Sequence, residues 1–244
     1  MPVGKAPSRN LRVLPWDSSF WQFRVAGWSP LRLTPARLRR AIQWCRRKRI
    51  RCLYACVDGE DLRTRSLLAK EGFVFADVRM EMSKTILPGR SRRGIRLREP
   101  TEKELPALCR MASRSHGNTR FGQDGNFDPA QVRRFYALWL AKAAARHAVL
   151  VLPGGKGSPA GYVTWEKESG RRGRIGLIAV ASDSRGRGWG RKLLEGAVAG
   201  FQRLGVREVR AATQGTSGRA VRMYEKAGFT VADVKVWYHR WFFR

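Results

Sequence analysis

The sequence predicts an α/β or α+β fold with a central mixed sheet, preceded by a smaller domain of related design. Three observations support this prediction. Strand-like and helix-like segments alternate along the 244 residues, a stretch without periodicity interrupts them at residues 87–94, and the phrase "LAKEGFVFADVR" returns later as "YEKAGFTVADVK". A hydrophobic content of 43% is enough to fill one large core or two modest ones.

The first half of the chain contains two predicted helices and two predicted strands. Thr34 is a suitable N-cap and Pro35 a suitable first helical residue, and apolar residues follow at helical spacing as far as Cys45. The next elements are a strand at 50–57, a helix at 61–71 that Gly72 ends, and a strand at 73–82.

The sequence "LPGRSRRG" separates the two halves. We therefore expect an N-terminal domain at residues 1–88, a linker at 89–94 and a C-terminal domain at 95–244. In the second half, Thr101 and Glu104 form a capping box before one helix, and Asp128 with Pro129 begins another, whose apolar face includes Phe135 and Trp139. The remaining elements are strands at 95–97, 148–152, 161–167, 174–180, 209–213 and 233–241, and a helix at 217–226.

The repeated phrase belongs to a longer internal match. Residues 50–79 align without a gap on residues 206–235, with about a third of the positions identical, and the match covers a strand, a helix and a strand. The pairs that keep register are Gly72 with Gly228, Phe73 with Phe229, and Asp77 with Asp233. We interpret the match as a duplication.

The formal charge of +30 comes mostly from arginine and has three interpretations. It is a compositional background on solvated surfaces, a field that attracts small polyanions such as nucleotides, or a nucleic-acid footprint. The basic residues occur along the whole chain, with dense clusters only in "CRRKRI" and "GRSRRG", so nucleic acid is the least favoured of the three.

The N-terminal segment, the lengths of the apolar runs and the cysteine spacing argue against a secreted protein, a membrane protein and a zinc protein. The start "MPVGKAPSRN" has no apolar segment typical of a secretion signal, and no apolar run approaches the ~20 residues that span a bilayer, so we expect a cytoplasmic protein. The four cysteines lack C-x-x-C spacing with partner histidines, so we expect buried free thiols and no metal site.

A glycine-rich loop distinguishes the C-terminal copy from the N-terminal one. It comprises Arg185, Gly186, Arg187, Gly188, Trp189 and Gly190, and it precedes a predicted helix where the first copy has "SPLRLT". Such a loop lets backbone N–H groups approach phosphate oxygens, and the helix N-terminus adds a partial positive charge. No Gly-Lys-Ser/Thr follows and no acidic ribose partner lies at the Rossmann distance, so neither motif applies.

The order strand, R-x-x-G-x-G, helix, strand and a helix ending in Tyr-Glu-Lys-x-Gly-Phe resembles the GNAT acyl-CoA N-acetyltransferases over residues 95–244. The resemblance implies a GNAT fold, acetyl-CoA as cosubstrate and no metal. It implies that Ile178, Ala179 and Val180 bind the pantetheine arm and that the loop amides from Arg185 to Gly190 bind the pyrophosphate. It further implies that Tyr224 protonates the departing thiolate. Ser217 replaces a family asparagine that contacts acetyl-CoA, and a serine can donate one hydrogen bond or cap the helix.

Within the family, the chain is most similar to enzymes that acetylate a nucleotide-linked amino sugar, through "LPWDSSFW", "RFGQDGNFDPAQVRRFYALW", "GYVTWEKESGRRGRIGL" and "RAATQGTSGRAVRMYEKAG". The N-terminal copy then resembles a degenerate GNAT half without the pyrophosphate loop or the tyrosine. The alternatives are an enzyme acting on a protein amine or an aminoglycoside-like molecule, and a non-catalytic nucleic-acid-binding protein. A homodimer is left open.

The predicted reaction is direct attack of a neutral amine on the acetyl thioester. The attacking amine must lose a proton, and the oxyanion needs N–H donors such as the strand amides of residues 178–180. His116, Asp124 and Glu166 are the candidate bases by location, although each is more typical of a surface or loop residue. Ordered water is the alternative base.

Overall fold

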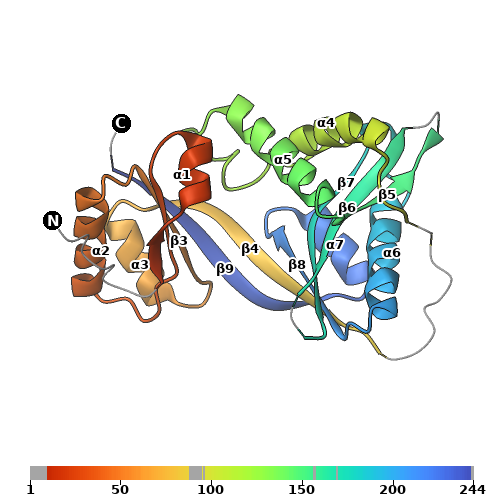
Figure 1. The fold of residues 1–244 in the computed structure, drawn as a ribbon. Helices are drawn as coiled ribbons and strands as arrows, with labels where there is room; N and C mark the ends of the chain where they lie inside the picture. Colours follow the sequence, from red (N-terminus) through yellow and green to blue (C-terminus); the bar gives the residue numbers. More distant parts are fainter. Residues whose placement is uncertain (1–9, 88–94, 96, 156–157, 169, 243–244) are drawn as a thin grey trace. The chain divides into compact units, whose positions relative to one another are not determined.

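The computed structural model describes residues 10–87, 95, 97–155, 158–168 and 170–242, and the predicted linker at 89–94 lies outside them. The strands are β1 Leu11–Val13, β2 Val25–Trp28, β3 Cys52–Asp58, β4 Val74–Thr85, β5 Val149–Pro153, β6 Pro159–Lys167, β7 Arg172–Val180, β8 Glu208–Gln214 and β9 Thr230–Trp241. The α-helices are α1 Pro15–Trp21, α2 Pro35–Arg47, α3 Leu62–Lys70, α4 Leu105–Ser115, α5 Pro129–Ala144, α6 Trp189–Arg203 and α7 Gly218–Lys226. The predicted α/β class and the mixed sheet are confirmed (Figure 1).

The chain divides into two compact units, each built from two segments. One unit is Met1–Arg79 with Val234–Arg244, and the other is Met80–Asp233. These units differ from the predicted domain ranges at both ends, because residues 80–85 of β4 cluster with the second unit and residues 234–241 of β9 with the first. Domain boundaries predicted from the order of the sequence miss this division, because they place each strand entirely in one half of the chain.

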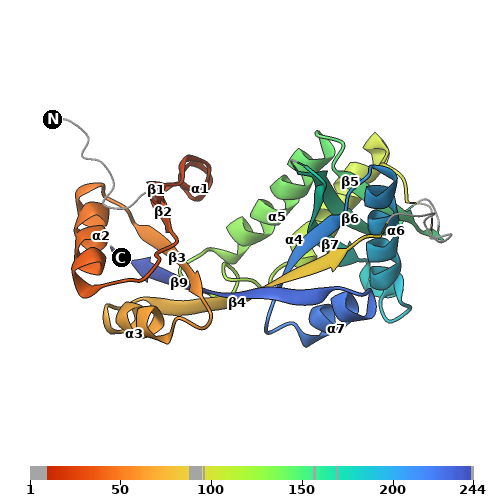
Figure 2. The ribbon, with the colours of Figure 1, turned by 90° about the horizontal axis from the view of Figure 1, so that it is seen from below.

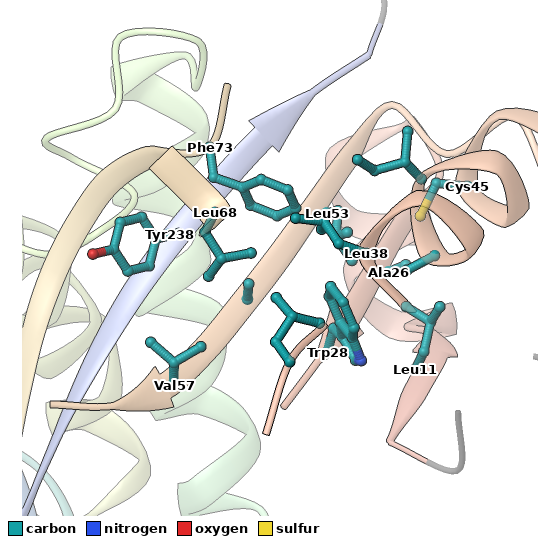
Figure 3. Close-up of a cluster of buried hydrophobic side chains, with 14 of the residues drawn as sticks. Leu11, Ala26, Trp28, Leu38, Cys45, Leu53, Val57, Leu68, Phe73 and Tyr238 are labelled. Carbon is teal, nitrogen blue, oxygen red and sulfur yellow. The ribbon is translucent and has the colours of Figure 1, made fainter. Parts of the chain in front are cut away.

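In the first unit the strand order is β1-β2-β3-β9. β2 and β3 are parallel, whereas β1 runs antiparallel to β2 and β9 antiparallel to β3, in a register from Cys52↔Trp241 to Asp58↔Lys235. The inner faces of α2 and α3 pack on this sheet, and Leu38, Leu68 and Phe73 are among the buried side chains (Figure 3). Tyr238 of β9 belongs to the same core, so the last strand of the chain completes the first unit.

In the second unit the strand order is β4-β8-β7-β6-β5. β5, β6 and β7 are antiparallel, and β7 is parallel to β8. Helix α6 packs on β5, β6 and β7, and α4 packs on α5 and on β6 and β7. The core comprises Met82 and Ile86 from the segment after α3, Leu193, Leu194 and Phe201 from α6, and Tyr224 and Phe229 from the repeat.

The helix starts match the sequence prediction closely because their caps form. Thr34 Oγ1 accepts the Arg37 N–H at 3.3 Å, and an Asp128 carboxylate oxygen accepts the Ala130 N–H at 2.9 Å. The Thr101 capping box forms as well, ahead of a short 3₁₀ turn at Glu102–Glu104. No helix in the described part of the chain is long and apolar enough to cross a membrane.

Two local predictions are wrong, and one stretch of structure was not predicted. Elements β1, α1 and β2 were not predicted at all. Residues 95 and 97 are not in a strand, and a single bridge pairs Arg98 with Val151 instead, while residue 96 lies outside the described part. On α5, Trp139 is 41% exposed and lies outside the buried face, which consists of Val132, Phe135, Tyr136, Leu140 and Ala143.

The duplication appears in the element bounds themselves. Each element of the second copy lies 156 residues after its counterpart, the separation of Leu68 and Tyr224. This offset relates β3 to β8, α3 to α7 and β4 to β9 at both ends of every element. The same offset relates Lys84 to Arg240. Lys84 Nζ donates to the Ala227 carbonyl and lies over the ring of Phe229, which follows α7. Arg240 lies over the ring of Phe73, which follows α3. Each copy therefore supplies its last strand to the other copy's unit.

Candidate active site

The glycine loop enters α6 through two left-handed residues. Gly186 has φ +81° and Gly188 has φ +74°, a conformation that side chains rarely adopt. A Cβ at either position would meet nothing within 4 Å, so backbone conformation rather than crowding requires glycine there.

These N–H groups are not used by the protein. Among the described residues, the N–H groups of Gly186, Arg187 and Gly188 donate no backbone hydrogen bond, and the first helical bond is from Lys192 N–H to the Gly188 carbonyl at 3.1 Å. The N–H groups of the first turn of α6 are likewise free of intrahelical partners. Together with the helix dipole they form a cradle of donors suited to an anion.

The outer half of β7 presents a second set of unpaired backbone groups. In the described residues the parallel register between β7 and β8 runs only from Arg172↔Glu208 to Ile175↔Ala211, although β7 continues to Val180. Leu177 N–H and Ala181 N–H both donate toward β6. Because backbone groups alternate along a strand, the N–H groups of Ile178 and Val180 point toward the β8 side, where the ladder has ended.

A β-bulge in β7 lies beside the point where its pairing with β8 ends, and it was not predicted from the sequence. The register between β6 and β7 shifts between Val163 and Trp165, and Thr164 Oγ1 accepts the Leu177 N–H at 2.7 Å. A Cβ at Gly176 would lie 2.5 Å from the same hydroxyl oxygen, so only glycine fits opposite Thr164. Bulges bend a strand and increase its twist. Gly176, a glycine inside a predicted strand, was the feature of the sequence that could have indicated the bulge.

Gly190 brings the loop, β7 and α7 together. A Cβ at Gly190 would lie 2.6 Å from Met223 Sδ and 3.9 Å from Val180 Cγ2. The first turn of α6 therefore packs directly against the end of β7 and against the residue before Tyr224, and both views show α6 beside α7 (Figures 1 and 2). The structure thus joins the loop, residues 178–180 and the tyrosine helix in one region of the second unit.

Tyr224 has a buried ring and an uncommitted hydroxyl. Its side chain is 1% exposed and packs edge-on against Phe229, with ring centroids 5.4 Å apart. Burial raises the pKa of the phenol well above its usual range. The hydroxyl forms no hydrogen bond with any residue that the structure describes, so its proton is available to a ligand.

Ser217 occupies the N-cap position of α7 without capping it. Its side chain accepts no cap hydrogen bond, while its carbonyl accepts the Val221 N–H at 3.0 Å. The capping role that the sequence allowed for Ser217 is therefore not observed. Its hydroxyl is left for another partner.

The three candidate bases have different surroundings. His116 Nε2 lies 2.8 Å from the Tyr162 hydroxyl, and burial lowers the pKa of its imidazole to about 4, so the ring is neutral near pH 7. An Asp124 carboxylate oxygen accepts the N–H of Asn126, as in a turn, and Glu166 is exposed on β6 opposite Arg174. His116 contacts two buried side chains of the second unit, Tyr136 and Tyr162.

His116 belongs to a group of hydrogen-bonded side chains from α5, β6 and the segment that follows α4. Its ring centroid lies 5.1 Å from that of Tyr136, with the two rings tilted by 36°. The Tyr136 hydroxyl donates to Thr119 Oγ1 at 2.8 Å, and the Thr119 hydroxyl donates to the His116 carbonyl at 3.3 Å. Tyr162 is paired in the sheet with Ala179, beside the unpaired edge of β7. Within the described residues, no group of three or more His, Cys, Asp or Glu side chains could hold a metal ion.

Comparisons with known proteins agree with this geometry. The family model described as "Acetyltransferase (GNAT) family" matches residues 108–229. A dTDP-fucosamine acetyltransferase of Escherichia coli O6:H1 is 31% identical over 142 residues, which are 57% of this chain and 60% of that protein. A mycothiol acetyltransferase of Propionibacterium freudenreichii subsp. shermanii is 38% identical over 78 residues, 30% of this chain and 25% of that protein. The chain therefore covers less than two thirds of the length of either curated relative.

A solved structure extends the likeness in fold to nearly the whole chain. A GCN5-related N-acetyltransferase from Sphaerobacter thermophilus superposes with a TM-score of 0.68 at 17% sequence identity. The match covers 95% of this chain and 76% of that one, so it includes both units.

Proposed function

The chain belongs to the GNAT family of acetyltransferases, and from that premise we propose that it transfers acetyl from acetyl-CoA to the amine of a nucleotide-linked amino sugar. The observation that carries the proposal is the packing of Gly190 between Met223 and Val180. It gathers the anion-binding loop, the unpaired edge of β7 and the helix of Tyr224 at one place. A cofactor arm held along β7 would then end near a proton donor.

The residues present fit coenzyme A. The free N–H groups from Gly186 to Gly190 suit a pyrophosphate, and the exposed arginines Arg185 and Arg187 add positive charge beside them. The unpaired N–H groups of Ile178 and Val180 suit the amide groups of a pantetheine arm. Acetyl-CoA supplies an activated acetyl thioester, and every other role proposed below falls to side chains and amides of this chain.

We assign Tyr224 as the general acid. The departing sulfur needs a proton, and a phenol whose pKa is raised by burial stays protonated near pH 7. Its hydroxyl has no partner among the described residues, so it can donate to the sulfur without first breaking a hydrogen bond. The β7 amides at Ile178 and Val180 would stabilise the oxyanion.

The first unit is proposed to be a degenerate copy that binds no cofactor. Its helix α2, the counterpart of α6, begins at Pro35, which has no N–H, and the Thr34 hydroxyl accepts the Arg37 N–H. Leu68 stands where the second copy has Tyr224 and is fully buried. The start of α2 therefore does not reproduce the donor cradle of α6, and position 68 does not provide the phenol of Tyr224.

The acceptor class is supported by the name of one curated relative, a dTDP-fucosamine acetyltransferase, whereas the other is named a mycothiol acetyltransferase. The test is acetyl-CoA turnover with the full-length protein on a panel of amines: dTDP-linked amino sugars, the corresponding free amino sugars, an aminoglycoside and an N-terminal peptide. We expect the nucleotide-linked sugars to have the highest kcat/KM. A higher value for the peptide or the aminoglycoside would reassign the acceptor, and no turnover with any amine, despite acetyl-CoA binding, would overturn the enzymatic proposal.

A further inference from the structure

Helix α2 and the turn after it carry a surface of cations without anionic partners. The chain has no Asp or Glu between Asp17 and Asp58. The basic residues in that interval are Arg24, Arg32, Arg37, Arg39, Arg40, Arg46, Arg47, Lys48, Arg49 and Arg51. None of them forms an ion pair with a residue that the structure describes.

Elsewhere several of the described cations pair with carboxylates. Arg98 pairs with Glu104, Arg174 with Glu168, Arg191 with Glu195 and Arg210 with Glu208, each at 2.5–2.8 Å. No such pair forms on α2 among the described residues, so its exposed side carries a run of cations that no neighbouring carboxylate compensates.

The cations are arranged on one face of α2. Leu38, Ala41, Ile42, Trp44 and Cys45 form its buried face. Arg39, Arg40, Arg46 and Arg47 are exposed on the opposite side, and together with Lys48 and Arg49 we call them the basic face. Arg39 and Arg46, like Arg40 and Arg47, are two turns or about 10 Å apart along the axis, so the charge extends along the helix.

Arg49 adds an independent observation. It adopts φ +51°, a left-handed conformation that is costly for a residue with a Cβ. Its counterpart in the second copy is Gly205, which has φ +73° at the end of α6. The first copy thus has an exposed arginine, in a conformation that costs it free energy, where the second copy has a glycine.

We propose that the basic face binds the phosphate backbone of a nucleic acid. The surface is longer than a single nucleotide requires, and the guanidinium groups that dominate it bind phosphate oxygens in bidentate fashion. An anionic membrane fits less well, because the apolar side of α2 is buried and its exposed residues include no large apolar side chain to insert. This inference is independent of the acetyl-transfer proposal, since α2 belongs to the first unit.

The test compares two variants that lose the same charge. Arg39→Gln/Arg40→Gln/Arg46→Gln/Arg47→Gln removes the basic face, and Arg110→Gln/Arg114→Gln/Arg133→Gln/Arg134→Gln removes four exposed arginines from α4 and α5. Binding to a 20-nucleotide RNA and to a 20-base-pair DNA duplex is measured by fluorescence anisotropy between 50 and 300 mM salt, with circular dichroism as the check on folding. Four lost phosphate contacts should lower the slope of log K against log salt by about 3 and the affinity by roughly 100-fold or more at 0.1 M salt.

A single substitution separates binding from folding. Arg49→Gly should raise the thermal midpoint, because it relieves the left-handed strain, while it weakens binding of either oligonucleotide several-fold. Equal losses in the two quadruple variants would show that binding follows net charge alone and would overturn the proposal. Absence of wild-type binding, or retention on phosphatidylglycerol vesicles with none on either oligonucleotide, would overturn it as well.

Discussion

Leu68 and Tyr224 occupy the same backbone position in the two copies of one strand–helix–strand unit. The carbonyl of each accepts the N–H of the phenylalanine five residues later, at 3.1 Å in the first copy and 3.0 Å in the second. The glycine in between is left-handed in both, with φ +73° at Gly72 and φ +80° at Gly228. The helix ends are equivalent, so the difference between the copies lies in the side chain, apolar in one and phenolic in the other.

We predict that Tyr224→Phe lowers kcat by roughly 100-fold and leaves the fold and acetyl-CoA affinity nearly unchanged. The variant loses only a hydroxyl that has no partner among the described residues, and the ring keeps its contact with Phe229. Pre-steady-state turnover at saturating acetyl-CoA measures the chemical step. A wild-type rate for that step would show that Tyr224 is a core residue and that another group protonates the thiolate.

The reciprocal substitution is the matched control. Leu68→Tyr should add no activity, because the first copy has no donor cradle, and it should destabilise the protein by roughly 1–3 kcal/mol, since Leu68 is fully buried in the core of the first unit (Figure 3). Urea denaturation measures the change in the free energy of unfolding.

The glycine loop can be tested with two substitutions at opposite ends of α6. Gly188→Glu places a carboxylate beside the free N–H groups and should weaken CoA binding by about 10-fold or more, since each lost charge-assisted contact costs roughly 1.5–3 kcal/mol. Gly205→Glu is the control, because Gly205 is also left-handed with no atom within 4 Å of its Cβ position. Calorimetric titration with CoA that finds the same affinity in both folded variants would remove the loop from the site.

Ser217→Asn should strengthen acetyl-CoA binding between about 2-fold and 10-fold. The side chain at this position is uncommitted, and an amide can supply one further hydrogen bond worth roughly 0.5–1.5 kcal/mol. Asparagine is also a favourable N-cap, so the thermal midpoint is measured alongside the affinity. A rise in the midpoint with no change in affinity would indicate a capping role only.

Local signals predicted much of this structure. The caps at Thr34, Thr101 and Asp128 form where the sequence placed them, and the gap-free repeat anticipated the constant offset between the copies. The β7 bulge opposite Thr164 and the contact of Gly190 with Met223 could not be predicted, because each depends on two segments whose separation in space the sequence does not state. The site residues themselves stay predictions, although the structure brings the loop, the end of β7 and α7 together.

The exchange of the last strands between the two units is the feature of the fold that was hardest to predict from the order of the sequence. Residues 80–85 and 234–241 continue strands that begin in the other unit, and their hydrophobic patterns are the same whichever unit they complete. Only the pairing of β9 with β3 and the burial of Met82 beside Leu193 and Phe229 reveal the exchange.

This exchange predicts that residues 95–244 do not fold alone. The fragment lacks Met82 and Ile86 from the core of the second unit, and deletion of one such buried side chain typically costs about 2–5 kcal/mol. It also leaves residues 235–241 without β3, which exposes an unpaired strand. We expect the fragment to aggregate or to lose its cooperative thermal transition, whereas a cooperative transition at the wild-type midpoint would contradict the division into units.

His116 gives a prediction for the pH dependence of stability. Burial lowers the pKa of its imidazole from 6.5 to about 4. The unfolded chain therefore binds a proton at this residue as the pH falls below about 6.5, while the folded protein does so only near pH 4. Its contribution to the free energy of unfolding is complete above pH 6.5 and is lost as the pH falls from 6.5 to 4, in total roughly 3 kcal/mol at about 1.4 kcal/mol for each pH unit.

The measurement is urea denaturation of the wild type and His116→Gln from pH 8 to pH 4. Between pH 6.5 and 4.5 the wild-type free energy of unfolding should fall more steeply, because glutamine does not titrate. Below pH 4.5 a second loss begins in both proteins, since hydrogen bonds from Arg98 lower the pKa of Glu104 to about 2 and the folded protein loses that advantage as the pH falls toward 2. Parallel curves for the two proteins above pH 4.5 would show that His116 titrates normally in the folded state, and would place its ring in contact with water rather than against Tyr136 and Tyr162.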